Sequence, residues 1–158
     1  MSKTVCFTGH RQIPDSDYTR LSALLCNTIE ELIKEGTEIF RTGGAIGFDT
    51  LAALNILLLR HTHPHIRLEL ILPCPTQTRG WAPNDIILYE QILKQADSHR
   101  YISQKYWNGV LQLRNRALVE GADACVAYLQ NSHGGGAAFT AALALQKGLK
   151  LINLHDLL

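Results

Sequence analysis

Strand-like and helix-like segments alternate along almost the whole chain, and this order restricts the fold more than any other feature. Short runs of β-branched and apolar residues, typical of buried strands, cover residues 3–8, 38–42, 66–72, 123–129 and 149–154, with a weaker run at 100–103. Segments with helical spacing lie between Asp15 and Gly36 and over residues 48–60, 84–96, 109–120 and 137–146.

Strands that alternate with helices pair in parallel, because each crossover needs a helix to return the chain. The order therefore predicts an α/β fold with a three-layer, doubly wound, mainly parallel sheet of the Rossmann-like kind. The length suits one compact domain, so we expect residues 1–158 to form a single domain.

The composition excludes several classes of protein. Hydrophobic residues make up 46% of the chain and charged residues 18%, which excludes a disordered tail or a fibrous repeat. The formal net charge is only +1, which argues against a nucleic-acid partner or an anionic membrane. The most apolar helical segment, residues 51–59, is too short to cross a bilayer. We therefore expect no membrane partner.

The cysteines and the first residues indicate a cytoplasmic protein. No CxxC pair occurs, and the four cysteines are far apart in sequence, at Cys6, Cys26, Cys74 and Cys125. This spacing does not suggest a disulfide framework. The first four residues lead directly into a strand without the apolar core of a secretion signal.

No metal is predicted, and the sequence identifies no cofactor. The best candidate for a zinc site is the alternating set His61, His63 and His65, which is interrupted by Pro64. It lacks the helical i, i+4 spacing of common sites and has no neighbouring cysteine or acidic ligand. A solvent-exposed loop is the preferred interpretation.

Glycine-rich turns follow three of the expected strands. They have the sequences TGHR (residues 8–11), TGGAIGFD (42–49) and NSHGGG (131–136). In a parallel sheet the carboxyl ends of the strands meet at one edge, where ligands bind. Glycines let backbone N–H groups approach an anion, and the following helix adds unpaired donors and a partial positive charge. Arg11 could hold a phosphate through two parallel hydrogen bonds.

These turns predict a phosphate-binding edge. The residues expected to line it are Thr8, Gly9, His10, Arg11, Gly43, Gly44, Ala45, Gly47, Asp49, Gly134, Gly135 and Gly136. One glycine cluster alone is more often only a tight turn, but three on one edge favour a binding site. No lysine completes a GxxxxGK[ST] loop, and residues 43–49 do not follow GxGxxG, so nicotinamide redox chemistry is not indicated.

The motifs resemble the SLOG superfamily, the Rossmann-like group that contains the DNA-processing protein DprA and the LOG cytokinin-activating phosphoribohydrolases. The resemblance spans nearly the whole chain. TGHR, a proline and a tryptophan after the third strand (Pro73, Trp81) and the pair Arg114-Asn115 make the chain most similar to the YpsA-like branch. The resemblance implies a small-molecule nucleotide derivative as partner, such as ADP-ribose, NAD or a nucleoside phosphate, and a homodimer by analogy with relatives.

One departure from the family bears on catalysis. The phosphoribohydrolases carry PGGxGTxxE, in which the threonine contacts phosphate and the glutamate serves catalysis. Here Gly136 stands at the threonine position, and Phe139 or Thr140 stands near the place of the glutamate. This argues against hydrolysis of a glycosidic bond by the same residues and leaves Asp49 as the candidate catalytic residue.

Each of the other polar candidates has a structural alternative. Asp49 is equally well explained as a helix N-cap and as a ligand to a ribose hydroxyl or a general base. From the helix pattern alone Arg114 and Asn115 would be surface residues, and the resemblance places them in the site. Trp81 has two interpretations. In one its ring stacks on a base, and in the other it packs its own loop against the sheet; the second is slightly preferred.

Three functions remain, in this order. The first is binding of a nucleotide derivative at the glycine-rich turns, including a sensor role. The second is an enzyme that cleaves an N-glycosidic or phosphate bond of such a ligand. The third is single-stranded DNA binding of the DprA kind, since the GGARGID-like segment of DprA resembles residues 43–49, although the low net charge disfavours it. Whether the protein is an enzyme stays open.

Overall fold

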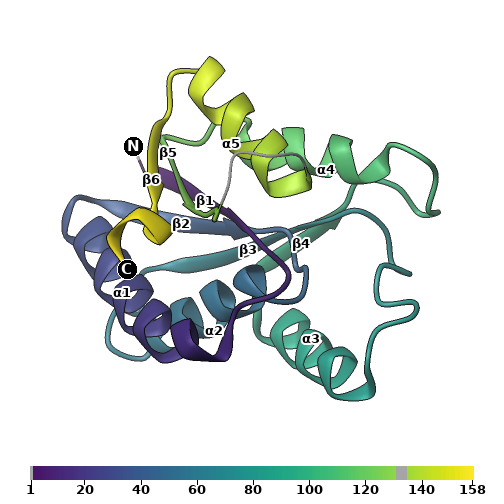
Figure 1. Cartoon of the computed structure of the whole chain (residues 1–158), viewed down its shortest axis with the longest axis horizontal. Helices are drawn as coiled ribbons and strands as arrows, with labels where there is room; N and C mark the ends of the chain where they lie inside the picture. The colour runs from purple at the N-terminus through teal and green to yellow at the C-terminus, as the bar shows by residue number, and fades with distance from the viewer. Residues whose placement is uncertain (1, 131–134) are drawn as a thin grey trace.

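A computed structural model describes residues 2–130 and 135–158, which fold around one parallel sheet (Figure 1). The elements in chain order are β1 (Lys3–Gly9), α1 (Asp15–Lys34), β2 (Thr37–Thr42), α2 (Phe48–Arg60), β3 (Arg67–Leu72), α3 (Pro83–Gln95), β4 (Ser98–Tyr101), α4 (Val110–Val119), β5 (Ala124–Tyr128), α5 (Gly136–Gln146), β6 (Lys150–Asn153) and the 3₁₀ helix η1 (Leu154–Leu157). The strands lie in the order β4-β3-β2-β1-β5-β6, and every neighbouring pair is parallel.

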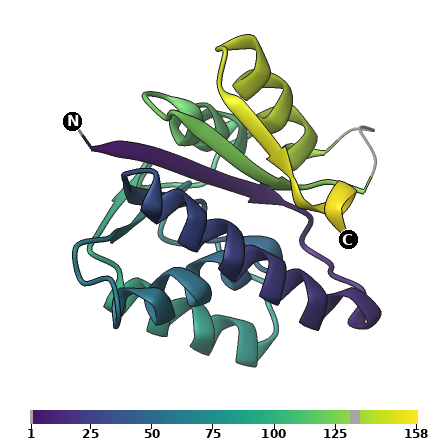
Figure 2. The same cartoon turned by 90° about the vertical axis from the view of Figure 1, so that its left-hand side faces the viewer.

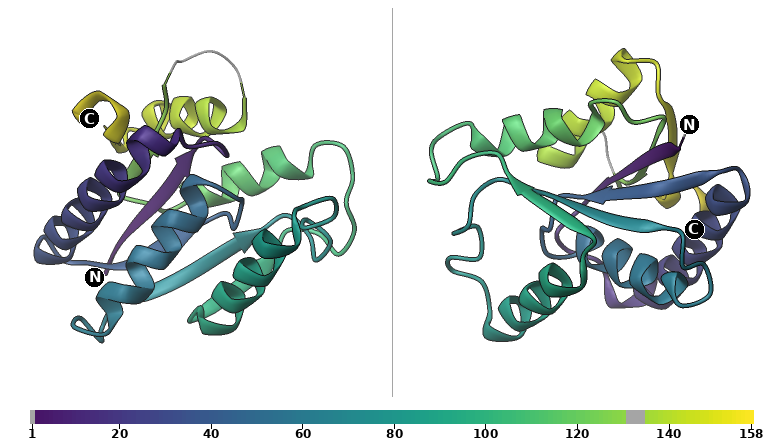
Figure 3. Two further views of the ribbon diagram at one scale, coloured as in Figure 1. Left: turned by 60° about the horizontal axis from the view of Figure 1, so that its bottom comes forward. Right: turned by 180° about the vertical axis from the view of Figure 1, so that it is seen from behind.

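Helices cover both faces of the sheet. Figures 1 and 2 show α1, α2 and α3 on one face and α4 and α5 on the other. Figure 3 shows the first three helices side by side, and α4 packs against α5 across the opposite face. The predicted three-layer, doubly wound α/β architecture is therefore confirmed.

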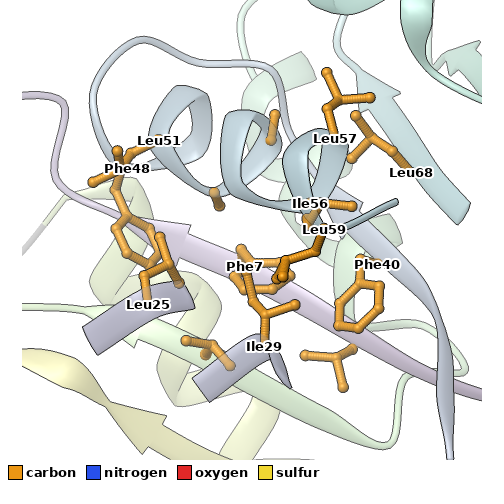
Figure 4. Packing of buried hydrophobic residues seen from close by; sticks show 14 of the residues in the cluster. Phe7, Leu25, Ile29, Phe40, Phe48, Leu51, Ile56, Leu57, Leu59 and Leu68 are labelled. Atoms are coloured by element: carbon orange, nitrogen blue, oxygen red, sulfur yellow. The ribbon is translucent and has the colours of Figure 1, made fainter. Parts of the chain in front are cut away.

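Alternating side chains of the strands pack into separate hydrophobic cores on the two faces of the sheet. In β1, Phe7 points to the face covered by α1 and α2, whereas Cys6 belongs to the cluster under α4 and α5. On the first face the rings of Phe7 and Phe40 lie 6.1 Å apart, and those of Phe7 and Phe48 lie 6.5 Å apart (Figure 4). Such tilted aromatic pairs add about 0.5–1.5 kcal/mol each beyond the area that they bury.

The second core is smaller and contains two thiols. Cys6 and Cys125 stand opposite one another on β1 and β5, and both are fully buried. The neighbouring Cys6 thiol and burial raise the pKa of the Cys125 thiol, which therefore stays protonated. Both cysteines are unbridged, as expected for small buried hydrophobic residues.

Two local features differ from the expectation. The strand expected at residues 100–103 lies two residues earlier, because β4 pairs with β3 from Ser98 to Tyr101. The turn η1 was not predicted, and it forms where the Asn153 side chain accepts a hydrogen bond from the His155 N–H. Over residues 2–130 and 135–158, no helix has both the length and the apolar character needed to cross a membrane.

The strand order creates a switch point between β1 and β5. From β1 the chain builds outward through β2, β3 and β4, then returns through α4 to place β5 on the other side of β1. The chain after β1 therefore leads to α1 on one face and the chain after β5 leads to α5 on the other (Figure 1), so a crevice opens between the ends of these two strands. The TGHR turn after β1 borders this crevice.

Gly9 fixes the distance between that turn and helix α2. A Cβ at Gly9 would lie 2.5 Å from ring atoms of Phe48 and 2.7 Å from its Cβ. The Phe48 N–H also donates to the His10 carbonyl (3.1 Å), so the TGHR turn and the start of α2 are joined through the backbone. No side chain larger than glycine fits at this contact.

We therefore predict that Gly9→Ala lowers the free energy of unfolding by about 3 kcal/mol, because the added methyl overpacks the junction with Phe48. Urea denaturation at constant protein concentration measures the change. Gly148→Ala is the control: its φ is +79°, and nothing lies within 4 Å of the added methyl, so only about 1 kcal/mol of backbone strain is expected. Equal losses of unfolding free energy in the two variants would show that contact with Phe48 does not exclude a larger residue at position 9.

Candidate functional site

A cleft of about 240 Å³ lies at the switch point between β1 and β5, and it is called the switch-point cleft below. Its walls come from the end of β1, from the turns that follow β1 and β2, and from α2, α4 and the start of α5. The lining residues are Thr8, Gly9, His10, Arg11, Ala45, Asp49, Leu111, Arg114, Asn115, Leu118, Gly135, Gly136 and Ala137. Segments more than one hundred residues apart in sequence thus face one another.

The TGHR turn forms one wall of the cleft. Thr8 is buried at the end of β1, and the Arg11 side chain is exposed at the rim. The His10 Nε2 accepts a hydrogen bond from the Gln130 N–H (2.8 Å), which ties this turn to the segment after β5. With Nε2 as the acceptor, the ring proton of a neutral His10 sits on Nδ1.

The start of α5 forms the opposite wall. Gly135 caps the helix with φ at +86°, and Gly136 is its first residue. The first backbone N–H groups of a helix have no partner within it and carry a partial positive charge. Because Gly135 and Gly136 line the cleft, an anion could approach this end of α5 without meeting a side chain.

The glycines of the second glycine-rich turn do not line the cleft; they allow neighbouring segments to pack closely behind its wall. A Cβ at Gly47 (φ +82°) would lie 2.2 Å from the Arg11 carbonyl oxygen, and one at Gly44 would lie 2.6 Å from Leu72. A Cβ at Gly43 would lie 2.6 Å from the Arg114 guanidinium. These three glycines therefore allow close packing behind the wall, while Ala45 and Asp49 from the same turn reach the cleft.

Arg114 and Asn115 are both buried, with 6% of each residue exposed. The Arg114 guanidinium donates to the Gly43 carbonyl (2.5 Å) and to the Asn115 Oδ1 (2.9 Å). The Asn115 Nδ2 in turn donates to the Gly136 carbonyl (3.5 Å). This chain of contacts links the turn after β2 with α4 and α5, so the surface position suggested by the helix pattern alone is wrong.

Asp49 is a buried carboxyl at the base of the cleft. It lies in the first turn of α2, whose N-cap is Gly47, and its Oδ2 accepts a hydrogen bond from the Ala45 N–H (3.2 Å). Burial raises the pKa of Asp49 from 3.8 to about 6, although the positive charges of Arg114 and Arg11 act in the opposite direction. Asp49 thus stabilises the turn between β2 and α2 through the Ala45 N–H, and its carboxyl loses its proton near pH 6.

A second cavity, of about 390 Å³, adjoins the cleft and shares Arg11 and Leu111 with it. We call it the side cavity. Its other lining residues are Pro73, Thr76, Gln77, Arg79, Trp81 and Tyr106. Trp81 therefore lies beside the switch-point cleft and not in it, and it is half-buried with its ring edge-to-face on Tyr89 (centroids 5.6 Å apart).

The structure brings most of the predicted site residues to one place. Residues of all three glycine-rich turns, together with Arg114 and Asn115, line the switch-point cleft, whereas Gly134 lies outside the described residues. Leu111, Leu118 and the residues of the side cavity other than Arg11 and Trp81 were not predicted as site residues. Their sequence positions carry no glycine motif, and only the packing of α4 against the sheet brings the two leucines to the cleft.

The family model YpsA, described as "YspA SLOG family", matches residues 6–156 of this chain. Similar sequences include the UPF0398 protein BH1768 of Halalkalibacterium halodurans, 31% identical over 134 residues that cover 80% of this chain and 71% of that protein. The uncharacterised SPbeta prophage-derived protein YoqJ of Bacillus subtilis is 29% identical over 129 residues, covering 73% of this chain and 75% of YoqJ.

Solved structures with the same fold include DNA processing protein A from Helicobacter pylori, studied for its single-stranded DNA binding mode. The TM-score is 0.64 at 20% identity, over 94% of this chain and 63% of that one. The structural genomics target TM1055 gives a TM-score of 0.58 at 19% identity, over 98% of this chain and 78% of the other. These similarities concern the fold, and this chain spans under two thirds of the Helicobacter protein.

We predict that NMR titration of the Asp49 side-chain carboxyl carbon gives a pKa near 6, and that Arg114→Gln raises it further, because the variant removes the largest charge that favours the carboxylate. Arg116→Gln is the matched control on the same helix, since the Arg116 side chain is exposed over the Phe139 ring. It should leave the pKa of Asp49 unchanged.

The same titration affects stability. The folded protein holds the Asp49 proton more tightly than the unfolded chain, so this group's contribution to stability falls by about 2 kcal/mol as pH rises from 4 to 6. Asp49→Asn should remove that decline. A pKa near 4 in the native protein, or an equal pH dependence in the Asn variant, would contradict the assignment.

Proposed function

This chain belongs to the YspA SLOG family, and from that premise we propose that it binds a nucleotide or nucleotide-derived ligand, with a phosphate of the ligand in the switch-point cleft. One observation carries the proposal: three glycine-rich turns, an arginine and a helix N-terminus converge on a single cleft. In this proposal residues 1–158 act as one nucleotide-binding domain.

The phosphate is placed between the start of α5 and Arg11. The backbone N–H groups of Gly136 and Ala137 are free of partners within the helix, and the small residues there leave room for oxygen atoms. The exposed Arg11 guanidinium can reach over the rim and pair with the same oxygens. Arg114 supplies a second positive charge from below, already held by Gly43 and Asn115.

Asp49 is assigned to the sugar and not to the phosphate. A carboxylate repels a phosphate, but it accepts hydrogen bonds from ribose hydroxyls, and the protonated form donates one. A bound phosphate would raise the pKa of Asp49 above 6, because a like charge disfavours the carboxylate. Ligand binding is therefore expected to take up a proton near neutral pH.

We predict that millimolar ribose 5-phosphate raises the melting temperature of the protein and that Arg11→Ala weakens its affinity about tenfold, the effect of one charge-assisted hydrogen bond. Isothermal titration calorimetry measures the affinity. Arg20→Ala is the control, because Arg20 pairs with Asp17 on the surface of α1, away from the cleft. The proposal fails if ribose 5-phosphate, AMP and ADP-ribose all leave the melting temperature unchanged.

The same calorimetric titration can be carried out with a single-stranded oligonucleotide as the ligand. The protein from Helicobacter pylori that shares this fold is described with a single-stranded DNA binding mode. The net charge of +1 disfavours a long nucleic-acid backbone here. Oligonucleotide binding that weakens with salt and is insensitive to Arg11→Ala would favour DNA over a small ligand.

The buried carboxyl supports a second candidate, hydrolysis of the N-glycosidic bond of a bound nucleotide. Asp49 as carboxylate would take a proton from water while the water oxygen bonds to C1′ of the ribose. The C1′–N bond breaks, the base leaves with the electron pair and takes up the proton that Asp49 removed from water, and ribose phosphate remains. This role does not need the threonine and glutamate that the α5 turn lacks.

If this second candidate is correct, AMP incubated with the protein yields adenine and ribose 5-phosphate, measured by chromatography. The rate at saturating AMP should rise with pH through a midpoint above 6, since the carboxylate is the active form and the bound phosphate raises its pKa. Asp49→Asn should reduce the rate by about 100-fold or more, while calorimetry confirms that AMP still binds. Full turnover in the Asn variant would remove Asp49 as catalyst, and absence of product would leave binding alone.

A further inference from the structure

The side cavity is the feature that the proposed function leaves unused. It adjoins the switch-point cleft, because Arg11 and Leu111 line both spaces. Small-molecule sites usually occupy about 300–1,000 Å³. The cleft, at about 240 Å³, falls below this range by itself, and a whole nucleotide needs the side cavity as well.

The walls of the side cavity suit a flat heteroaromatic ring. Trp81 and Tyr106 supply aromatic surface, and Pro73 and Leu111 supply aliphatic surface. Stacking on such rings is favourable for every nucleobase, because each base has a π face. Edge-to-face contact with the buried Tyr89 ring holds Trp81 in place before any ligand arrives.

The charges and polar groups of the cavity agree with the same occupant. Arg11 stands where the cavity meets the cleft, Arg79 lies on its wall, and none of the described lining residues is acidic. Thr76 and Gln77 add a hydroxyl and an amide to the lining, and the buried Gln77 Nε2 has no hydrogen-bond partner among the described residues. A second carboxylate or a purely apolar tail would match these walls less well.

We propose that the side cavity is a base-binding subsite, in which Trp81 and Tyr106 stack on the nucleobase of a ligand whose phosphate occupies the switch-point cleft. The inference rests on the proposed function and adds the class of ligand: a nucleoside phosphate with its base intact, rather than a sugar phosphate. Arg11, which lines both spaces, then pairs with the phosphate at the border between the cleft and the side cavity.

Titrations with three probes separate this inference from the proposed function. Ribose 5-phosphate reports on the cleft, adenosine on the side cavity, and AMP on both. We expect AMP to bind about 5- to 100-fold more tightly than ribose 5-phosphate, the range that base stacking provides. Ribose 5-phosphate binding without any gain for AMP overturns the base subsite and leaves the phosphate site intact. If none of the three probes bound, both proposals would fail.

Neighbouring aromatic residues provide a matched pair of variants. Tyr106 lines the side cavity and is 62% exposed, so Tyr106→Ala should fold normally. Trp107, the next residue, is 45% exposed and does not line the described cavity. Tyr106→Ala should lose most of the advantage of AMP over ribose 5-phosphate, whereas Trp107→Ala should keep it. Equal effects of the two variants would overturn the subsite.

Trp81 can be followed directly by fluorescence. The chain has two tryptophans, so Trp107→Phe leaves Trp81 as the sole indole emitter. In this variant AMP and adenosine should quench the emission, and ribose 5-phosphate should not. AMP binding measured by calorimetry without any change in Trp81 emission would place the base elsewhere and refute the subsite.

Discussion

The buried guanidinium of Arg114 is the interaction on which the arrangement of the site depends. Removing a charge from water costs several kcal/mol unless partners replace the lost hydration. Here the Gly43 carbonyl, the Asn115 amide oxygen and the charge of Asp49 serve as those partners. They belong to the turn between β2 and α2 and to α4, so one buried cation fixes elements from opposite faces of the sheet against each other.

Topology places this cation beneath an opening. The chain changes direction between β4 and β5, and the loops at the ends of β1 and β5 separate toward different layers. Glycines then let the surrounding backbone close in: Gly47 lies against the Arg11 carbonyl, and Gly43 lies against the Arg114 guanidinium. The result is a cleft whose rim combines glycine backbone with the Arg11 side chain and whose base is charged.

The base of the cleft contains two buried groups of opposite charge, Arg114 and Asp49. Arg114 favours an anion in the cleft, and ionised Asp49 opposes it, while burial keeps the pKa of Asp49 at about 6. In the proposed function, the balance between these groups would couple ligand charge to proton uptake. The same carboxyl can therefore serve sugar recognition or proton transfer, according to what occupies the cleft.

Local sequence was sufficient for the order of strands and helices, since periodic burial and turn residues are properties of short segments. It also identified the glycine-rich turns and, through the SLOG resemblance, Arg114 and Asn115. Only the tertiary structure showed that Arg114 is buried, that Gly43, Gly44 and Gly47 support the wall more than they line it, and that Trp81 borders a separate cavity. These properties depend on contacts between segments far apart in sequence, as when residue 43 meets residue 114, and no local pattern records such contacts.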